Sequence, residues 1–259
     1  MKHFVYAMAI VILAAGCKKN SATNEAPLST SQSDAAPQAR ASTTVQFSGY
    51  TWTIRNTGTA TQGPGPNVFN GSNAWVDANG WLHLKITKNA TTGKWNCAEI
   101  YSNQSFGYGT YQWQVEGAID KFDKNIVLGL FNYSGNDTHD EMDIEFAHWG
   151  NAAWPNLNYT VWPAAGVNTN WDYTQFFSLT GTYTTHRFTR TANSVVFKSL
   201  GGFYNDDTNL FASQTTPSTA SISTLAMPVH MNLWLFNGNA PSDGKEVEII
   251  IHNFKYTAG

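Results

Sequence analysis

Charged residues are scarce in this sequence. Asp, Glu, Lys and Arg make up only 13% of its 259 residues, and the formal net charge is -3. No basic stripe appears that could provide the electrostatic footprint of a nucleic-acid-binding protein. Nucleic acid is therefore not an expected partner.

The sequence also lacks an apolar run long enough to span a bilayer. The longest run, Phe4–Ala15, follows Lys2 and has the length of a signal-peptide core. It leads into Cys17 through the letters LAAGC, which resemble the lipobox of bacterial lipoproteins. This resemblance implies that residues 1–16 are removed and that Cys17 is lipidated and anchors the protein in a membrane. No Asp follows Cys17, which in such lipoproteins implies the outer membrane, periplasmic or surface-exposed. The alternative is an ordinary signal peptide with an unrelated cysteine.

Cysteine is nearly absent as well. Beyond Cys17 only Cys97 remains, so the mature chain cannot form an intrachain disulfide, and we expect Cys97 to be a partly buried small hydrophobe. Residues 17–44 are mostly Ser, Thr, Ala, Asn, Gln and Pro without periodicity, which predicts a disordered tether after the lipidated cysteine. A single domain is expected over residues 45–259, and we expect a monomer.

Amphipathic helices are missing too, whereas aromatic residues reach 14%. Apolar and polar residues alternate in short segments between turn signals, which predicts strands. The predicted strands cover residues 81–86, 108–116, 126–131, 194–198, 229–234 and 247–254. Many short strands favour an all-β fold, and we predict a two-sheet jelly-roll sandwich with one sheet curved into a concave groove.

The most informative segment is Asp140–Phe146, with the letters DEMDIEF. Alternate side chains of a strand point to opposite faces, so three acids share one face and three apolar residues share the other. The acids are Glu141, Asp143 and Glu145, and the apolar residues are Met142, Ile144 and Phe146. Three carboxylates on one face repel each other, and such clustering raises the pKa of at least one of them, as a general acid requires.

This spacing is compatible with glycosidase chemistry. The Cα atoms of Glu141 and Glu145 lie roughly 13 Å apart on an ideal strand, whereas a retaining pair needs carboxyl groups about 5–5.5 Å apart. Two long side chains close that gap only over a concave sheet. A solvated edge strand and a calcium site are alternative uses of the same acids.

The letters EMDIEF resemble the catalytic strand of glycoside hydrolase family 16, the lichenase and laminarinase family, in its uninterrupted lichenase-like form. Two further segments resemble blocks of this family in the same order, namely residues 97–111 and the letters MNLW at residues 231–234. The resemblance implies a concanavalin A-type jelly roll and a retaining mechanism. It implies that Glu141 is the nucleophile, that Glu145 is the general acid and base, and that Asp143 orients the nucleophile.

The same resemblance implies a set of substrate-binding residues, which are Glu99, Tyr101, Phe106, Tyr108, Asn232 and Trp234. Lichenases place an Arg where Tyr101 stands and an aromatic residue where His139 stands, so the resemblance does not identify which polysaccharide is the substrate. The favoured function is endo-acting hydrolysis of a β-linked polysaccharide, with β-glucan preferred. A transglycosylase on the same scaffold and a non-catalytic glycan-binding lipoprotein are the alternatives. No cofactor is expected to be required, and the family implies a possible structural calcium whose ligands the sequence does not identify.

Overall fold

The computed structural model describes residues 43–259, so residues 1–16, Cys17 and nearly all of the predicted tether lie outside the described part. The domain contains sixteen strands and three short 3-10 turns, at Gly71–Asn73, Ile119–Lys121 and Phe236–Gly238. Within residues 43–259 no helix has the length and apolar character needed to cross a membrane. The predicted all-β class is confirmed.

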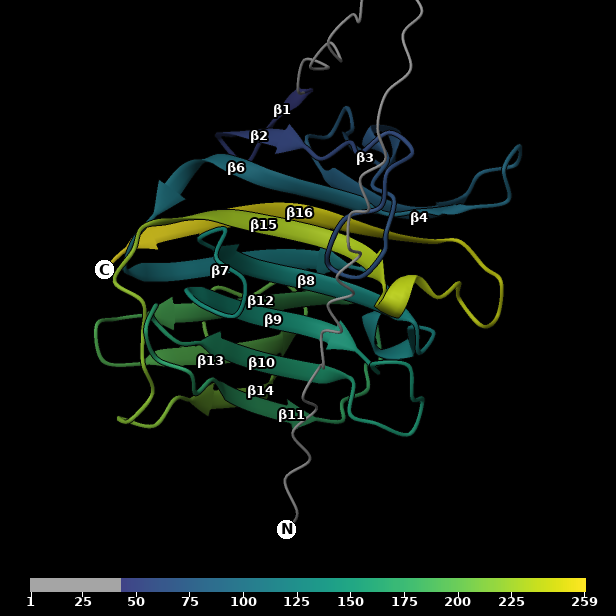
Figure 1. Ribbon diagram of the computed structural model, residues 1–259. Helices are drawn as coiled ribbons and strands as arrows, with labels where there is room; N and C mark the ends of the chain where they lie inside the picture. The colour runs from purple at the N-terminus through teal and green to yellow at the C-terminus, as the bar shows by residue number, and fades with distance from the viewer. Residues whose placement is uncertain (1–42) are drawn as a thin grey trace, which may run out of the picture. The chain divides into compact units, whose positions relative to one another are not determined.

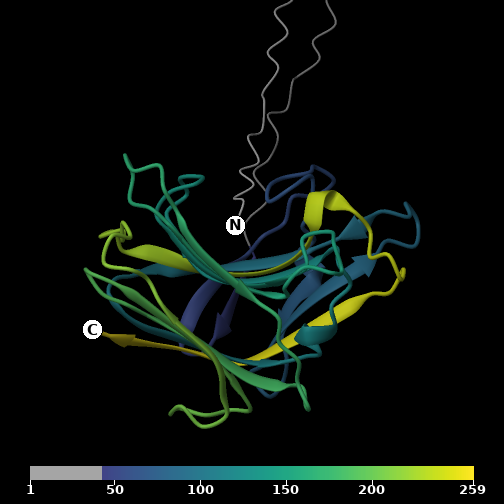
Figure 2. The same ribbon diagram turned by 90° about the horizontal axis from the view of Figure 1, so that it is seen from below.

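The strands form two antiparallel sheets that pack face to face as a jelly-roll sandwich (Figures 1 and 2). The first sheet has the order β1 (Thr44–Phe47), β2 (Tyr50–Ile54), β6 (Ala98–Phe106), β15 (Met227–Leu235), β8 (Ile126–Tyr133), β9 (Glu141–Ala147), β10 (Leu157–Trp162) and β11 (Trp171–Gln175). The second has the order β14 (Leu210–Thr215), β13 (Val195–Gly201), β12 (Tyr183–Arg190), β7 (Gly109–Glu116), β16 (Val247–Ala258), β4 (Leu82–Lys88) and β3 (Ala74–Val76), and β5 (Trp95–Asn96) pairs with β4.

All six strands expected from the alternation pattern are present, and most extend by a few residues beyond the predicted ends. Their inward residues fill the space between the sheets with large aromatic and aliphatic side chains. Cys97 lies in this core, where burial raises the pKa of its thiol to about 12. A thiol with such a pKa is rarely a thiolate, so Cys97 acts as a buried hydrophobe.

The acidic segment forms β9, which is an interior strand. It pairs with β8 on one side and β10 on the other, so the edge-strand alternative is wrong. Met142, Ile144 and Phe146 are fully buried between the sheets. The acidic side chains of β9 must therefore point away from the core, over the outer surface of the first sheet.

The start of β7 depends on a glycine. Gly109 has a φ of +146° and lies opposite Ala258 of β16, and a Cβ atom there would lie 2.4 Å from the carbonyl oxygen of Thr257. Gly109→Ala should destabilise the domain by about 2–3 kcal/mol, because a backbone oxygen cannot move aside as a flexible side chain could. Urea unfolding of the two proteins measures this difference.

Gly107→Ala is the matched control, because a Cβ atom at Gly107 would meet nothing within 4 Å. It should leave the free energy of unfolding within about 1 kcal/mol of the wild type. Equal stability of the Gly109 and Gly107 variants would contradict the close approach of β7 and β16.

Candidate active site

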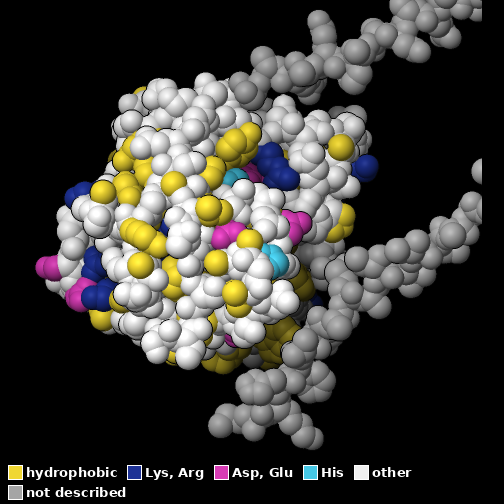
Figure 3. Space-filling view, turned by 60° about the vertical axis from the view of Figure 1, so that its left-hand side comes forward, with side chains coloured by type: hydrophobic (Ala, Val, Ile, Leu, Met, Phe, Trp, Pro, Cys, Tyr) yellow, Lys and Arg dark blue, Asp and Glu magenta, His cyan; other side chains and the backbone are white. Residues whose placement is uncertain are grey.

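The acidic face of β9 opens into a cavity of about 680 Å³ on the outer face of the first sheet. Its walls combine acidic, basic, histidine and aromatic side chains. In the space-filling view, acidic, basic, histidine and hydrophobic side chains lie together on one face of the domain (Figure 3). The lining residues are Arg55, Gly63, Pro64, Gly65, Glu99, Tyr101, Phe131, Tyr133, Asp137, Glu141, Asp143, Glu145, His230, Asn232 and Trp234.

Strand register sorts most of these residues into three rows that run across the sheet. Each acid of β9 belongs to one row. The rows are Glu99–Asn232–Gly129–Glu145–Asn158, then Tyr101–His230–Phe131–Asp143–Thr160, then Tyr133–Glu141–Trp162. Residues directly opposite each other on neighbouring strands have side chains within contact distance. The β-pairing therefore brings together residues that lie far apart in the sequence.

The first row contains one position without a side chain. The Oδ1 atom of Asn232 accepts a hydrogen bond of 3.1 Å from the backbone N–H of Gly129. A Cβ atom at Gly129 would lie only 2.5 Å from this oxygen. Gly129 thus lets Asn232 lie against the sheet and leaves open space beside Glu145.

The three acids of β9 all have raised pKa values, and burial is the largest cause for each. Burial raises the pKa of Glu141 to about 7 and that of Glu145 to about 8, and the charge of Glu141 adds to the shift at Glu145. Burial and the charges of both glutamates raise the pKa of Asp143 well above its usual range. A hydrogen bond between Asp143 and Glu141 lowers the pKa of Glu141 and raises that of Asp143. Asp143 is therefore the protonated donor of this hydrogen bond, and the Glu141 carboxylate accepts it.

A further buried carboxylate, Glu99, is held by two partners. Its Oε2 atom accepts a hydrogen bond of 2.6 Å from Nη1 of Arg55, and its Oε1 atom lies 2.9 Å from Nδ1 of His230. The imidazole is also stacked against Tyr101 and Phe131, with ring centroids 5.4 and 5.0 Å away. Because Nδ1 faces a carboxylate, this nitrogen carries a proton and donates it in a hydrogen bond to Glu99.

Another aromatic group borders the first row. Trp234 lines the cavity, and its ring lies 6.3 Å from that of Trp149. The indole N–H of Trp149 donates to Oδ1 of Asn158, which lies opposite Glu145 in the row. The cavity thus has an aromatic wall beside Glu145.

Seven of the nine residues predicted from the sequence line this cavity. Two do not, namely Phe106 and Tyr108, and core burial contradicts the assignment of Phe106 to substrate binding. Phe106 is 2% exposed and packs in the core against Tyr50 and Tyr256. Tyr108 lies in the turn between β6 and β7, under the guanidinium of Arg190. Phe106 is seven positions from Glu99, and an odd number of steps along a strand reverses the face.

Eight of the fifteen lining residues were not predicted from the sequence, and three of these are Gly63, Pro64 and Gly65 in the loop after β2. His230 shares a face of β15 with Asn232 and Trp234, so alternation alone could have identified it. Phe131 and Tyr133 lie on β8, a strand on which the sequence predicted no site residue. Arg55 follows β2, and Asp137 lies in the loop before β9, where its carboxylate accepts a hydrogen bond from the Tyr133 hydroxyl. No local pattern marks these two residues.

Among residues 43–259 no group of three or more His, Cys, Asp or Glu side chains is arranged to hold a metal ion. The structure therefore identifies no calcium ligands within residues 43–259, and a calcium site stays a prediction.

Comparison with known proteins adds a family and a fold. The model of "Glycosyl hydrolases family 16" matches residues 65–249. Comparison with curated proteins gave no match. Similar solved structures include a β-glucanase of Bacillus licheniformis, at 22% identity and a TM-score of 0.58, covering 80% of this chain and 92% of that chain.

Two other solved structures are similar at 16% identity. One is a family 16 protein of Bacteroides ovatus from a mixed-linkage glucan utilisation locus, in complex with a G4G4G3G product, with a TM-score of 0.61 and coverage of 80% of this chain and 94% of that chain. The other is an immunostimulatory antigen and pseudo β-1,3-glucanase of Mycobacterium tuberculosis, with a TM-score of 0.60 and coverage of 80% and 91%. At these identities the likeness concerns the fold.

The raised pKa of Glu145 makes stability depend on pH. Its folded-state pKa of about 8 lies above the value of about 4.3 expected in the unfolded chain. Between these values the folded state binds the extra proton, so the free energy of unfolding falls as pH rises. Glu145→Gln removes this dependence, and it should stabilise the protein by about 2 kcal/mol at pH 9 but not at pH 4.

Denaturant unfolding of both proteins at the two pH values measures the effect. Asp172→Asn is the control, because Asp172 is an exposed carboxylate on β11 of the same sheet. An equal change in stability at pH 4 and pH 9 for Glu145→Gln would show that burial of its charge is not the cause.

Proposed function

The chain belongs to glycoside hydrolase family 16, and on this premise we propose that it is a retaining endo-glycoside hydrolase of a β-linked polysaccharide, with β-glucan the favoured substrate. The observation that carries the proposal is the set of three acids on β9, which face one cavity with distinct ionisation states. The β-glucanase of Bacillus licheniformis and the product complex of Bacteroides ovatus support a β-glucan as substrate.

The two glutamates suit different roles. Glu141 has the lower pKa of the pair and receives a hydrogen bond from Asp143, which favours its ionised form, as a nucleophile requires. Glu145 has the higher pKa and holds a proton at neutral pH, as a general acid requires. Asp143 donates the hydrogen bond that orients Glu141. Because the raised pKa of Asp143 favours its protonated form, the three acids together carry less negative charge in their buried site.

The reaction then proceeds in two steps. Glu145 protonates the glycosidic oxygen while Glu141 attacks the anomeric carbon, so the leaving sugar departs and a glycosyl-enzyme forms. Glu145, now a carboxylate, takes a proton from water. The resulting hydroxide equivalent attacks the same carbon and releases Glu141. Two inversions at one carbon leave the β-configuration unchanged.

The remaining cavity residues fit a sugar chain lying across the strands. Tyr101, Phe131 and Trp234 offer aromatic faces to the C–H surface of pyranose rings. Asn232 and His230 offer polar atoms for hydroxyl groups. Because Arg55 and His230 hold both oxygens of Glu99, this residue positions His230 and has little capacity left to bind sugar itself.

The cellular setting follows from the N-terminal sequence alone. We propose that the protein is an outer-membrane lipoprotein whose substrate is a polysaccharide met in the cell envelope or outside the cell. Incorporation of labelled palmitate in a bacterial host tests the anchor. Wild-type protein should carry the label and partition with membranes, and Cys17→Ser should do neither. Labelling of the Cys17→Ser variant would contradict this assignment.

Glu141→Gln and Glu145→Gln should each lower kcat on a cleaved β-glucan by a factor of about 10³ or more, because each removes a group that acts on the reacting atoms. Reducing-end release across mixed-linkage glucan, laminarin and xyloglucan measures the activity and identifies the substrate. The Asp172→Asn variant should retain the wild-type rate, and circular dichroism checks that each variant is folded.

Proton NMR of the first product gives the stereochemistry, and release of the β-anomer is expected from a retaining enzyme. Wild-type turnover in either glutamine variant, or first release of the α-anomer, contradicts the mechanism. Binding of these glucans without any cleavage would favour a glycan-binding protein, and one structural neighbour is described as a pseudo β-1,3-glucanase. Transfer to an added acceptor sugar in place of hydrolysis would identify a transglycosylase.

A further inference from the structure

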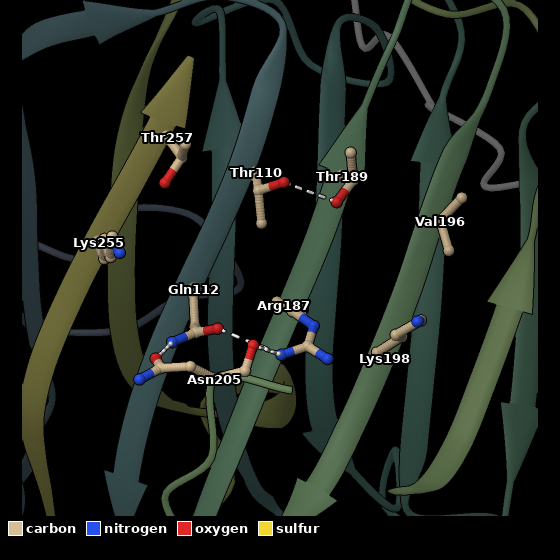
Figure 4. A pocket seen from close by; sticks show the side chains of 9 residues that line it. All are labelled: Thr110, Gln112, Arg187, Thr189, Val196, Lys198, Asn205, Lys255 and Thr257. Atoms are coloured by element: carbon tan, nitrogen blue, oxygen red, sulfur yellow. Dashed lines mark hydrogen bonds between the residues drawn. The ribbon is translucent and has the colours of Figure 1, made fainter. Parts of the chain in front are cut away.

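A second hollow lies on the outer face of the second sheet. It has a volume of about 450 Å³, and nine side chains from β7, β12, β13, β16 and the loop after β13 line it (Figure 4). The lining residues are Thr110, Gln112, Arg187, Thr189, Val196, Lys198, Asn205, Lys255 and Thr257. None of them belongs to the cavity that contains the acids of β9.

Strand register places eight of these side chains in two parallel rows. One row carries amide and cationic groups and runs Lys255–Gln112–Arg187–Lys198. The other is mostly hydroxyl-bearing and runs Thr257–Thr110–Thr189–Val196. Adjacent strands are about 4.8 Å apart, so each row spans roughly 14 Å. A ligand lying across the strands would meet a cationic row on one side and a hydroxyl row on the other.

The floor of the hollow is held rigid. Arg187 and Gln112 are only 8% and 7% exposed. Nη1 of Arg187 donates to Oε1 of Gln112 at 3.3 Å, and Nε2 of Gln112 donates to Oδ1 of Asn205 at 3.0 Å (Figure 4). Asp207 completes the wall by pairing with both Arg187 and Lys198. The polar groups are therefore positioned before any ligand arrives.

The charge of the hollow is opposite to that of the whole protein. The full chain has a net charge of -3, yet three of the eleven Lys and Arg residues in residues 43–259 line this hollow. No acidic side chain is among its nine lining residues, and Asp207 at the rim balances one of the three cations. Lys255 makes no ion pair within residues 43–259.

This arrangement is not explained by stability. Arg187 and Lys198 are directly opposed in register, and like charges in that position destabilise a sheet. Asp207 offsets part of the repulsion from an exposed loop position, where ion pairs contribute little. A bound anion would offset the remaining repulsion between Arg187 and Lys198, because hydrogen bonds between ionised groups of opposite sign are the strongest ones.

We propose that this hollow is a second, non-catalytic binding site for an acidic saccharide, with carboxylate or sulfate groups over the Lys255–Lys198 row and sugar hydroxyls over the threonine row. A saccharide fits better than a bare anion, because three threonine hydroxyls lie beside the cations. Those of Thr110 and Thr189 hydrogen-bond each other at 2.8 Å, and each can still make a further hydrogen bond to a sugar hydroxyl. The proposal does not require the cavity of β9 to be catalytic.

NMR titration of the full chain with a galacturonic acid trimer tests the site. Resonances of residues around the hollow should shift, and the affinity should fall at least fivefold between 50 and 500 mM NaCl, because ionic contacts are screened. Lys255→Ala should weaken binding at least fivefold, and Lys255→Arg should restore most of it. Lys88→Ala is the matched control, since it removes a lysine from β4 of the same sheet outside the hollow, and it should bind as the wild type does.

A neutral galactose trimer and inorganic sulfate complete the comparison. Neither should approach the affinity of the acidic trimer. Unchanged binding in Lys255→Ala, or an equal affinity for the neutral trimer, overturns the proposal. Sulfate binding as tightly as the acidic trimer means that the hollow holds an adventitious ion only. Hydrolysis of β-glucan by Lys255→Ala should match the wild type, so failure of this proposal and failure of the proposed function are separate results.

Discussion

Every feature of the candidate active site depends on the two-faced packing of one interior strand. Met142, Ile144 and Phe146 of β9 are buried between the sheets, and this burial holds the strand in a single register with β8 and β10. A slip by one residue would move three carboxylates into the core and three apolar groups into water, which is prohibitively unfavourable. The register that burial enforces is also what aligns each acid with its row of neighbours.

The cost of the arrangement is electrostatic, and the surroundings offset it only in part. The raised pKa of Asp143 keeps its proton between the two glutamates, and the Arg55 guanidinium neutralises the nearby Glu99, whose other oxygen is held by His230. Burial keeps the pKa values of Glu141 and Glu145 raised, and no Lys, Arg or His within residues 43–259 forms an ion pair with either. A site that needs one acid and one base near neutral pH requires this incomplete compensation, since full neutralisation by a cation would lower both pKa values.

The two outer faces of the sandwich use the same structural device for different chemistry. On the first sheet, cross-strand rows bring acids, aromatic rings and an amide around one cavity. On the second sheet, rows of the same kind bring cations, amides and hydroxyls around a smaller hollow. In both places a loop or turn closes the wall, with residues 63–65 on the first and Asn205 on the second. Side chains on neighbouring strands are the natural unit of recognition on a β-sandwich, because the pairing of strands sets their spacing.

The sequence by itself determined the all-β class, the strand that carries the acids and the division of that strand into an apolar and an acidic face, because these depend on alternation between neighbouring residues. It also marked Glu99, Tyr101, Asn232 and Trp234 through blocks that resemble a family, but it misplaced Phe106, where the face of the strand had to be followed over several residues. Only the tertiary structure decided that Arg55 and Asp137 join the cavity, that His230 bridges Glu99 and two aromatic rings, and that Lys255 and Lys198 share one row. These facts depend on which strands pair and in what register, and such pairing is set by long-range packing between segments that no local pattern connects.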